Sequence, residues 1–153
     1  MLRLIVLSDT HGNMPKLRQL AKTFCDYDFV FHLGDYAKDI KEFEEQLGDK
    51  LISVKGNCDF GGEPAFLQLE KVKIMAVHGN KYGVKSTLNK LFLSAKEQGC
   101  SLVLYGHTHC AIIINEDGVT MVNPGSMERF SKPSYAVIEI DGNKINAKIE
   151  NLA

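Results

Sequence analysis

Two histidines, His107 and His109, stand one residue apart and directly follow Gly106. The apolar run Leu102-Val103-Leu104 precedes them, so the pair lies where a buried strand is expected to end. Imidazole nitrogens are common ligands of transition metals, and a glycine lets the chain turn sharply at that point. Histidines also occur as ordinary polar loop residues. The pair therefore predicts a metal site only if other strand ends supply further ligands.

Four other expected strand ends carry a metal-competent side chain beside a glycine. They are His11-Gly12, Gly34-Asp35, Gly56-Asn57 and His78-Gly79. In open α/β sheets, ligands bind outside the carboxyl ends of the strands, so the five neighbouring ends should converge on one pocket. The candidate metal ligands at these ends are Asp9, His11, Asp35, Asn57, His78, His107 and His109.

This donor set is larger than one tetrahedral ion uses. It comprises two carboxylates, one amide and four imidazoles, and one bridging carboxylate would let the set serve two ions. Two metals about 3.5–4 Å apart can stabilise both the attacking and the leaving oxygen of a displacement at phosphorus. Mixed nitrogen and oxygen donors suit Mn, Fe, Co, Ni or Zn better than Ca or Mg. The expected cofactors are therefore two divalent transition metal ions, with Mn first among them.

The elements that must position these residues alternate early in the chain and form hairpins later. Apolar runs predict strands at residues 2–7, 29–33, 51–54, 66–70, 72–77, 102–105, 111–114, 119–122, 135–140 and 144–149. Helical spacing predicts helices at about 13–25, with Asn13 as N-cap, and at about 38–47 and 84–95. We predict an α/β fold in which two mixed β-sheets pack face to face as a sandwich, with helices on the outer faces in a four-layer αββα arrangement. A single doubly wound sheet is the alternative, but it would leave the terminal hairpins harder to place.

Size and composition indicate one ordinary globular domain, residues 1–153, with 44% hydrophobic and 24% charged residues. The net charge of −1 gives no electrostatic reason to expect a nucleic-acid duplex or a membrane as partner. No apolar run approaches the ~20 residues of a membrane span, and the N-terminal run is too short for a signal peptide. The four cysteines are scattered, which indicates free thiols and a cytoplasmic location, with Cys25, Cys100 and Cys110 expected to be buried.

As an ordered set, the motifs resemble those of the calcineurin-like metallophosphoesterase family, from about residue 4 to 126. The motifs are Asp9-x-His11, Gly34-Asp35, Gly56-Asn57-Cys58-Asp59, His78-Gly79 and Gly106-His107-x-His109. The small size and the Gly-Asn-Cys-Asp motif are similar to the compact YfcE-like phosphodiesterase branch. The resemblance implies hydrolysis of small phosphodiesters by attack of a metal-bound hydroxide on phosphorus.

The resemblance also implies a division of the ligands between the two metals. Asp9, His11 and His109 would hold one metal, and Asn57, His78 and His107 the other. Asp35 would bridge them. Asp35, Asn57 and His107 would act in catalysis by positioning the metals and the phosphate.

One position departs from the family pattern. Many members carry a histidine where this chain has Cys58, and that histidine assists the leaving group. Because a thiol is a poor substitute for an imidazolium, we expect diesters with better leaving groups rather than phosphomonoesters. Cys58 and Asp59 are further candidates for contact with the substrate. His32 lies inside an apolar run, so it is expected to be a packed histidine or one that orients a ligand by a hydrogen bond.

Two other functions compete with this one. The small retromer subunit resembles this fold, so a non-catalytic, metal-binding scaffold or interaction module is one alternative. A metal-dependent hydrolase of C–N or C–O bonds is another, and it requires the motif order to be accidental. The complete ligand set argues against a scaffold, because unpaired like charges in a pocket are costly. The expected partner is a small phosphoester substrate, and a homo-oligomer stays open.

Overall fold

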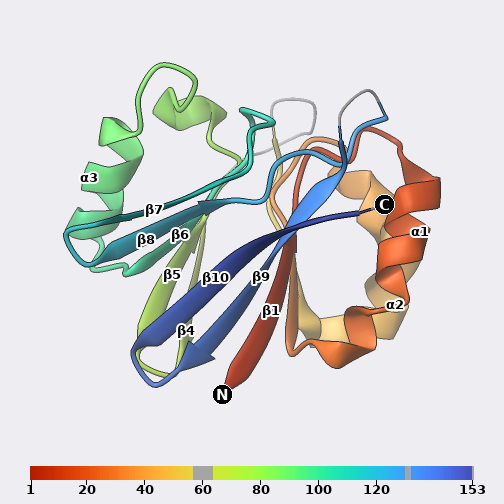
Figure 1. Cartoon of the computed structure of the whole chain (residues 1–153), viewed down its shortest axis with the longest axis horizontal. Helices are drawn as coiled ribbons and strands as arrows, with labels where there is room; N and C mark the ends of the chain where they lie inside the picture. Colours follow the sequence, from red (N-terminus) through yellow and green to blue (C-terminus); the bar gives the residue numbers. More distant parts are fainter. Residues whose placement is uncertain (57–63, 130–131, 153) are drawn as a thin grey trace.

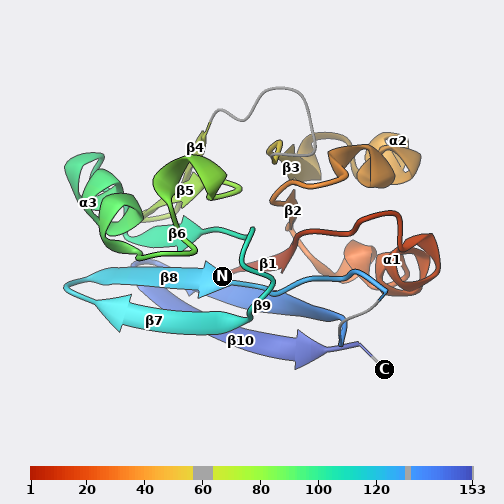
Figure 2. The same ribbon diagram turned by 90° about the horizontal axis from the view of Figure 1, so that it is seen from above.

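The computed structural model describes residues 1–56, 64–129 and 132–152. Within these ranges the chain forms two five-stranded mixed sheets that pack face to face, with helices on the outer faces (Figures 1 and 2). The predicted sandwich is confirmed, and the single doubly wound sheet is wrong. The terminal hairpins decide the matter, because one belongs to each sheet.

The first sheet has the strand order β10-β9-β1-β2-β3. Its parallel strands are β1 (Leu2–Leu7), β2 (Phe29–His32) and β3 (Leu51–Ser53). The hairpin of β9 (Ser134–Asp141) and β10 (Lys144–Asn151) adds antiparallel to β1. Three strand ends that carry predicted ligands therefore lie side by side in this sheet.

The second sheet has the order β4-β5-β6-β8-β7. Its parallel strands are β5 (Val72–Ala76), β6 (Leu102–Leu104) and β8 (Val119–Asn123). The antiparallel strands β4 (Ala65–Leu69) and β7 (Ile112–Glu116) close its two edges. This sheet thus contributes the ends of β5, β6 and β8 to the same rim of the sandwich (Figure 1).

The helices differ from the prediction in length and type. They are α1 (Met14–Ala21), α2 (Glu44–Leu47) and α3 (Asn89–Glu97), with 3-10 turns at Phe24–Asp26, Ala37–Phe43, Gly48–Lys50 and Asn80–Tyr82. The segment predicted as one helix at 38–47 is 3-10 up to Phe43 and α-helical only at Glu44–Leu47. The buried residues Ile40 and Phe43 are three apart, a spacing that does not distinguish the two kinds of helix. No helix in the described ranges is long and apolar enough to cross a lipid bilayer.

The core has three layers of apolar side chains, which follow from the alternation along the central strands. Leu4 and Val6 of β1 face the second sheet, whereas Ile5 and Leu7 face α1 and the 3-10 turns. On the far side, residues of β5 and β6 such as Met75 pack against α3. The two sheets are therefore covered on both faces, which fixes the ends of their parallel strands relative to each other.

The cysteine prediction is right at one position. Cys100 is buried, but Cys25 and Cys110 are exposed, and all three are free thiols. Cys25 lies in the short turn after α1 and Cys110 in the loop after β6, where a small apolar side chain does not have to be covered. Cys58 lies outside the described residues.

Candidate metal centre

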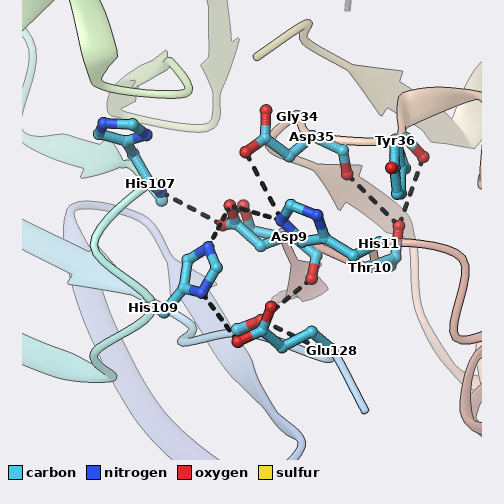
Figure 3. Close-up of polar contacts among 12 residues, drawn as sticks. Asp9, Thr10, His11, Gly34, Asp35, Tyr36, His107, His109 and Glu128 are labelled. Atoms are coloured by element: carbon cyan, nitrogen blue, oxygen red, sulfur yellow. Dashed lines mark hydrogen bonds and ion pairs between the residues drawn. The ribbon is translucent and has the colours of Figure 1, made fainter. Parts of the chain in front are cut away.

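The loops that leave the two sheets are joined to one another by backbone hydrogen bonds. In the first sheet the amide of Asp9 donates to the carbonyl of Gly34 at 2.9 Å. In the second sheet the amide of Gly106 donates to the carbonyl of His78 at 2.9 Å. The amide of His107 then donates to Oδ2 of Asp9 at 3.2 Å and links the two sheets. The loops after β1, β2, β5 and β6 thus form one site. Figure 3 shows residues of the loops after β1, β2 and β6 in it.

Asp9 lies at the centre of this site and is fully buried. Its Oδ2 accepts hydrogen bonds from Ser8 Oγ at 2.6 Å and from the amide of His107. Its Oδ1 faces Nε2 of His109 at 3.1 Å and Nε2 of His11 at 3.7 Å. Among the described residues, Asp9 Oδ1 and His11 Nε2 are buried atoms without a hydrogen bond. A carboxylate oxygen and an imidazole nitrogen orphaned side by side fit a cation between them.

The candidate ligands fall into two groups that share one residue. The first group is Asp9, His11, Asp35 and His109, and the second is Asp35, His78 and His107; within each group the ligand atoms lie within 4.8 Å of one another. Oδ2 of Asp35 lies 3.6 Å from Nε2 of His11 and 3.4 Å from Nε2 of His78. A carboxylate between two clusters of nitrogen donors suits a bridge between two cations.

All the predicted ligands in the described ranges therefore come together in one place. Asn57 and its neighbours Cys58 and Asp59 lie outside those ranges, so their predicted roles stay predictions. His32 belongs to neither group.

The ring of His78 is oriented by the backbone of the first sheet. Its Nδ1 lies 2.8 Å from the carbonyl oxygen of Leu33. Because a carbonyl oxygen only accepts, Nδ1 carries the proton and Nε2 presents its lone pair to the site. That Nε2 lies 3.1 Å from Nδ1 of His107. Two imidazole nitrogens that face each other in this way suit a common cation.

The backbone at the site adopts a conformation that non-glycine residues seldom take. Five candidate ligands have positive φ: Asp9 (+53°), His11 (+44°), Asp35 (+58°), His107 (+72°) and His109 (+61°). Tyr36, next to Asp35, also has a positive φ, of +60°. Such left-handed residues cost about 1–3 kcal/mol each and gather at functional sites. The concentration of strain here supports a functional role for these loops.

Two glycines allow the loops to approach one another closely. A Cβ on Gly106 would collide with Ser8 Oγ and lie 2.9 Å from Asp9 Oδ2. Gly34 has φ +101°, and a Cβ there would lie 2.5 Å from the amide nitrogen of Gly56. The predicted role of glycine in crowding the backbones together is confirmed at these two positions.

Burial and neighbouring charges shift the pKa values of three candidate ligands. Burial raises the pKa of Asp9, and the hydrogen bond from Ser8 opposes this only in part. Burial lowers the pKa of His78, but its contact with Asp35 and the charge of Asp9 outweigh it, so the pKa lies above its ordinary value. Burial and the charges of His78 and Lys85 lower the pKa of His107. Perturbed pKa values of this kind are typical of functional sites.

His32 is part of a buried network that joins the loops after β1 and β2. Its Nδ1 accepts from the amide of Gly34 at 3.1 Å, so its Nε2 carries the proton and donates to Thr10 Oγ1 at 3.0 Å. Thr10 Oγ1 donates to Oδ2 of Asp39 at 2.7 Å, which also accepts from the amide of Gly12 at 2.8 Å. His32 therefore helps to fix the loops that carry the candidate ligands.

The loop after β8 braces the site, and the sequence indicated only a loop there. Ser126 Oγ donates to the carbonyl of Asp9 at 3.0 Å, and Asn123 Nδ2 donates to Thr108 Oγ1 at 2.8 Å. Asn13 Nδ2 donates to the carbonyl of Met127 at 2.7 Å. Asn13 is the N-cap residue of α1, as predicted, and its carbonyl accepts from the amide of Leu17 at 3.1 Å, but its side chain makes no capping hydrogen bond. The glycine in Asn123-Pro124-Gly125-Ser126, directly after a strand, was the signal of a sixth strand end at the site.

Comparison with known proteins agrees with the geometry. The model of the calcineurin-like phosphoesterase superfamily domain matches residues 2–143. The chain belongs to this superfamily. The family is metal-dependent, and the two groups of nitrogen and oxygen donors described above are this chain's candidate ligands.

Two relatives and two solved structures illustrate the similarity. The probable metallophosphoesterase YsnB of Bacillus subtilis is 30% identical over 159 residues, which cover 99% of this chain and 92% of YsnB. The phosphodiesterase YfcE of Escherichia coli K12 is 27% identical over 171 residues, with 92% and 89% covered. A predicted phosphoesterase of Streptococcus pneumoniae has a TM-score of 0.81 at 27% identity, with 98% and 89% covered. Vps29 of Entamoeba histolytica, in complex with Zn²⁺, has a TM-score of 0.78 at 17% identity, with 99% and 100% covered, which shows the fold alone.

Proposed function

We propose that the protein is a two-metal phosphodiesterase that hydrolyses small phosphodiesters. The observation that carries the proposal is the place of Asp35, whose Oδ2 lies within 3.6 Å of His11 Nε2 and 3.4 Å of His78 Nε2. In this proposal Asp35 bridges two cations. Asp9, His11 and His109 hold one cation, and Asn57, His78 and His107 hold the other.

Two divalent cations at this position would lower the pKa of a water molecule and neutralise charge on phosphoryl oxygens. The residues of the chain hold the donors in place for this. Ser8 and the amide of His107 fix Oδ2 of Asp9, so that Oδ1 faces the first group. The carbonyl of Leu33 fixes the ring of His78. Because these partners are already in place, little reorganisation is required when a substrate binds.

The preference for diesters over monoesters rests on two observations. Cys58 stands where many family members carry the histidine that assists the leaving group. The relative YfcE is named a phosphodiesterase. We also propose Mn as the metal and the cytoplasm as the location, on the mixed donor set and the scattered cysteines.

The second candidate function is that of a non-catalytic scaffold or interaction module. The likeness to Vps29 supports it at the level of the fold alone. Because that Vps29 is itself described in complex with Zn²⁺, metal binding does not separate the two functions. Catalytic turnover does. Two buried carboxylates, Asp9 and Asp35, destabilise the fold when no cation lies between them. We favour the enzyme because hydrolysis requires this arrangement, whereas a scaffold does not.

A screen of phosphomonoesters and phosphodiesters against a panel of divalent metals tests the proposal. We expect hydrolysis of aryl or nucleotide diesters with Mn or a similar transition metal, and less hydrolysis of the matched monoesters. The protein treated with chelator is the control for each substrate. Absence of turnover with every metal and substrate, in protein that still binds metal, would favour the scaffold.

A further inference from the structure

Glu128 lies against the outer edge of the His109 ring (Figure 3). Its Oε1 is 3.2 Å from Nδ1 of His109, while Nε2 of the same ring faces Oδ1 of Asp9 at 3.1 Å. An ionised carboxylate only accepts hydrogen bonds, so Nδ1 carries the proton. The lone pair on Nε2 is then directed at the first group of candidate ligands.

The backbone of Glu128 is held by the same loop that braces Asp9. Its amide donates to Ser126 Oγ at 3.1 Å, and that hydroxyl donates to the carbonyl of Asp9 at 3.0 Å. The side chains of Glu128 and His109 are 28% and 31% exposed, so water reaches them only in part. The backbone from which the Glu128 side chain extends is therefore anchored to the loop that carries Asp9.

The second group of candidate ligands is built differently. There, the ring of His78 is oriented by the neutral carbonyl of Leu33. An imidazole whose N–H group faces a carboxylate is a more basic metal ligand than one whose N–H group faces a neutral carbonyl. The carboxylate also adds a negative charge close to the cation. The two groups thus differ in the partner of one histidine: His109 has a charged carboxylate as partner, whereas His78 has a neutral carbonyl.

We propose that Glu128 is a positioning residue that sets the affinity of one of the two metal sites. It holds His109 in the tautomer and orientation that present Nε2, and it strengthens cation binding by Asp9, His11 and His109 without touching the cation. The site built around His78 does not depend on it. This inference rests on the proposed function, because it requires cations in both sites.

The test is a calorimetric titration of metal-stripped protein with Mn²⁺ alone. We expect two binding events in the wild type. Glu128→Ala should weaken one of them about 10–100-fold and leave the other unchanged. Glu128→Gln should lose less Mn²⁺ affinity than Glu128→Ala, because its amide oxygen still accepts a hydrogen bond from Nδ1 of His109. Glu97→Ala, at the exposed end of α3, is the matched control and should bind as the wild type does.

A second readout follows the ring itself. Long-range ¹H–¹⁵N spectra of the metal-free protein should show the proton of His109 on Nδ1 in the wild type and in Glu128→Gln. In Glu128→Ala the two tautomers should become mixed. A general structural defect would not change one histidine in this way, so this measurement separates positioning from loss of folding.

Three results would overturn the inference alone, and a fourth would reject the proposed function with it. Unchanged Mn²⁺ affinity in Glu128→Ala would show that the carboxylate has no effect on the cation. Equal weakening of both events would show a general structural role. An unchanged His109 tautomer in metal-free Glu128→Ala would also contradict the inference, provided that the wild type shows two binding events. Wild-type protein that binds no Mn²⁺ would reject the proposed function itself, and the inference would fall with it.

Discussion

His107 and His109 are separated by one residue, yet their rings face different groups of candidate ligands. Nδ1 of His107 lies 3.1 Å from Nε2 of His78, whereas Nε2 of His109 lies 3.1 Å from Oδ1 of Asp9. The ring of His107 points away from Asp9, whereas its amide donates to that carboxylate (Figure 3). Both residues have positive φ, so the chain here is not extended and side chains two residues apart do not have to point to the same side. In the proposed centre the short motif therefore joins two metal sites and does not form one chelate.

Substitution of the shared carboxylate should affect both metals. Asp35→Asn removes the charge of the proposed bridge, so we expect the protein to lose affinity for both ions. His109→Ala removes a donor from one group only and should lower the occupancy of one site. Metal analysis after dialysis against limiting Mn²⁺ gives the number of ions bound per chain in each variant.

Asp49→Asn, on an exposed turn, is the control for the charge change and should keep the wild-type metal content. Full occupancy of both sites in Asp35→Asn would contradict the assignment of Asp35 as the bridge.

The network of Thr10, His32 and Asp39 should contribute to stability as well as to the site. Thr10→Val keeps the shape of the side chain but removes the buried hydroxyl that joins His32 to Asp39. We expect the free energy of unfolding to fall by about 1–3 kcal/mol. Urea unfolding of the metal-free protein measures this.

The control for this substitution is Thr120→Val, which removes a hydroxyl whose hydrogen bond to Asn115 is at the surface. It should change the free energy of unfolding by less than about 0.5 kcal/mol. An equal fall in the free energy of unfolding in the two variants would mean that the buried network contributes no more to stability than a surface hydrogen bond does.

The identity of residue 58 should affect the choice of substrate. Cys58→His restores the imidazole that many family members carry, so it should raise monoester hydrolysis relative to diester hydrolysis if that group limits the reaction. The measurement is the ratio of kcat/KM for matched aryl mono- and diesters. Cys58→Ala is the control, because it removes the thiol without adding a proton donor. An unchanged ratio in Cys58→His would leave Cys58 without a role in specificity.

The strands could be predicted because their apolar residues are contiguous in the sequence. The run before His107 and the runs before Asp9 and Asp35 are each short, apolar and followed by a polar turn with glycine, and all three are strands. The helix at 38–47 could not be predicted in detail, because Ile40 and Phe43 fit both the α and the 3-10 periods. The local sequence pattern thus predicts the positions of the strands and helices well, but it does not predict which kind of helix forms.

The candidate ligands could be identified in the sequence for the same reason, but the residues that support them could not. Asn13 has the sequence context of an N-cap, yet its side chain bonds to Met127, 114 residues away. Ser126 bonds to the carbonyl of Asp9 across 117 residues. No short motif contains both partners of such a bond. The residues that hold the site together are therefore visible only once the two sheets are packed.

The central claim is that hydrolysis depends on two cations. The most direct measurement is a titration of metal-stripped protein with Mn²⁺, in which bound metal and diesterase activity are recorded on the same samples. We predict negligible activity without metal and full activity only as occupancy approaches two ions per chain. Hydrolysis that is unchanged after the metal is stripped, or that is complete with one ion per chain, would contradict the account.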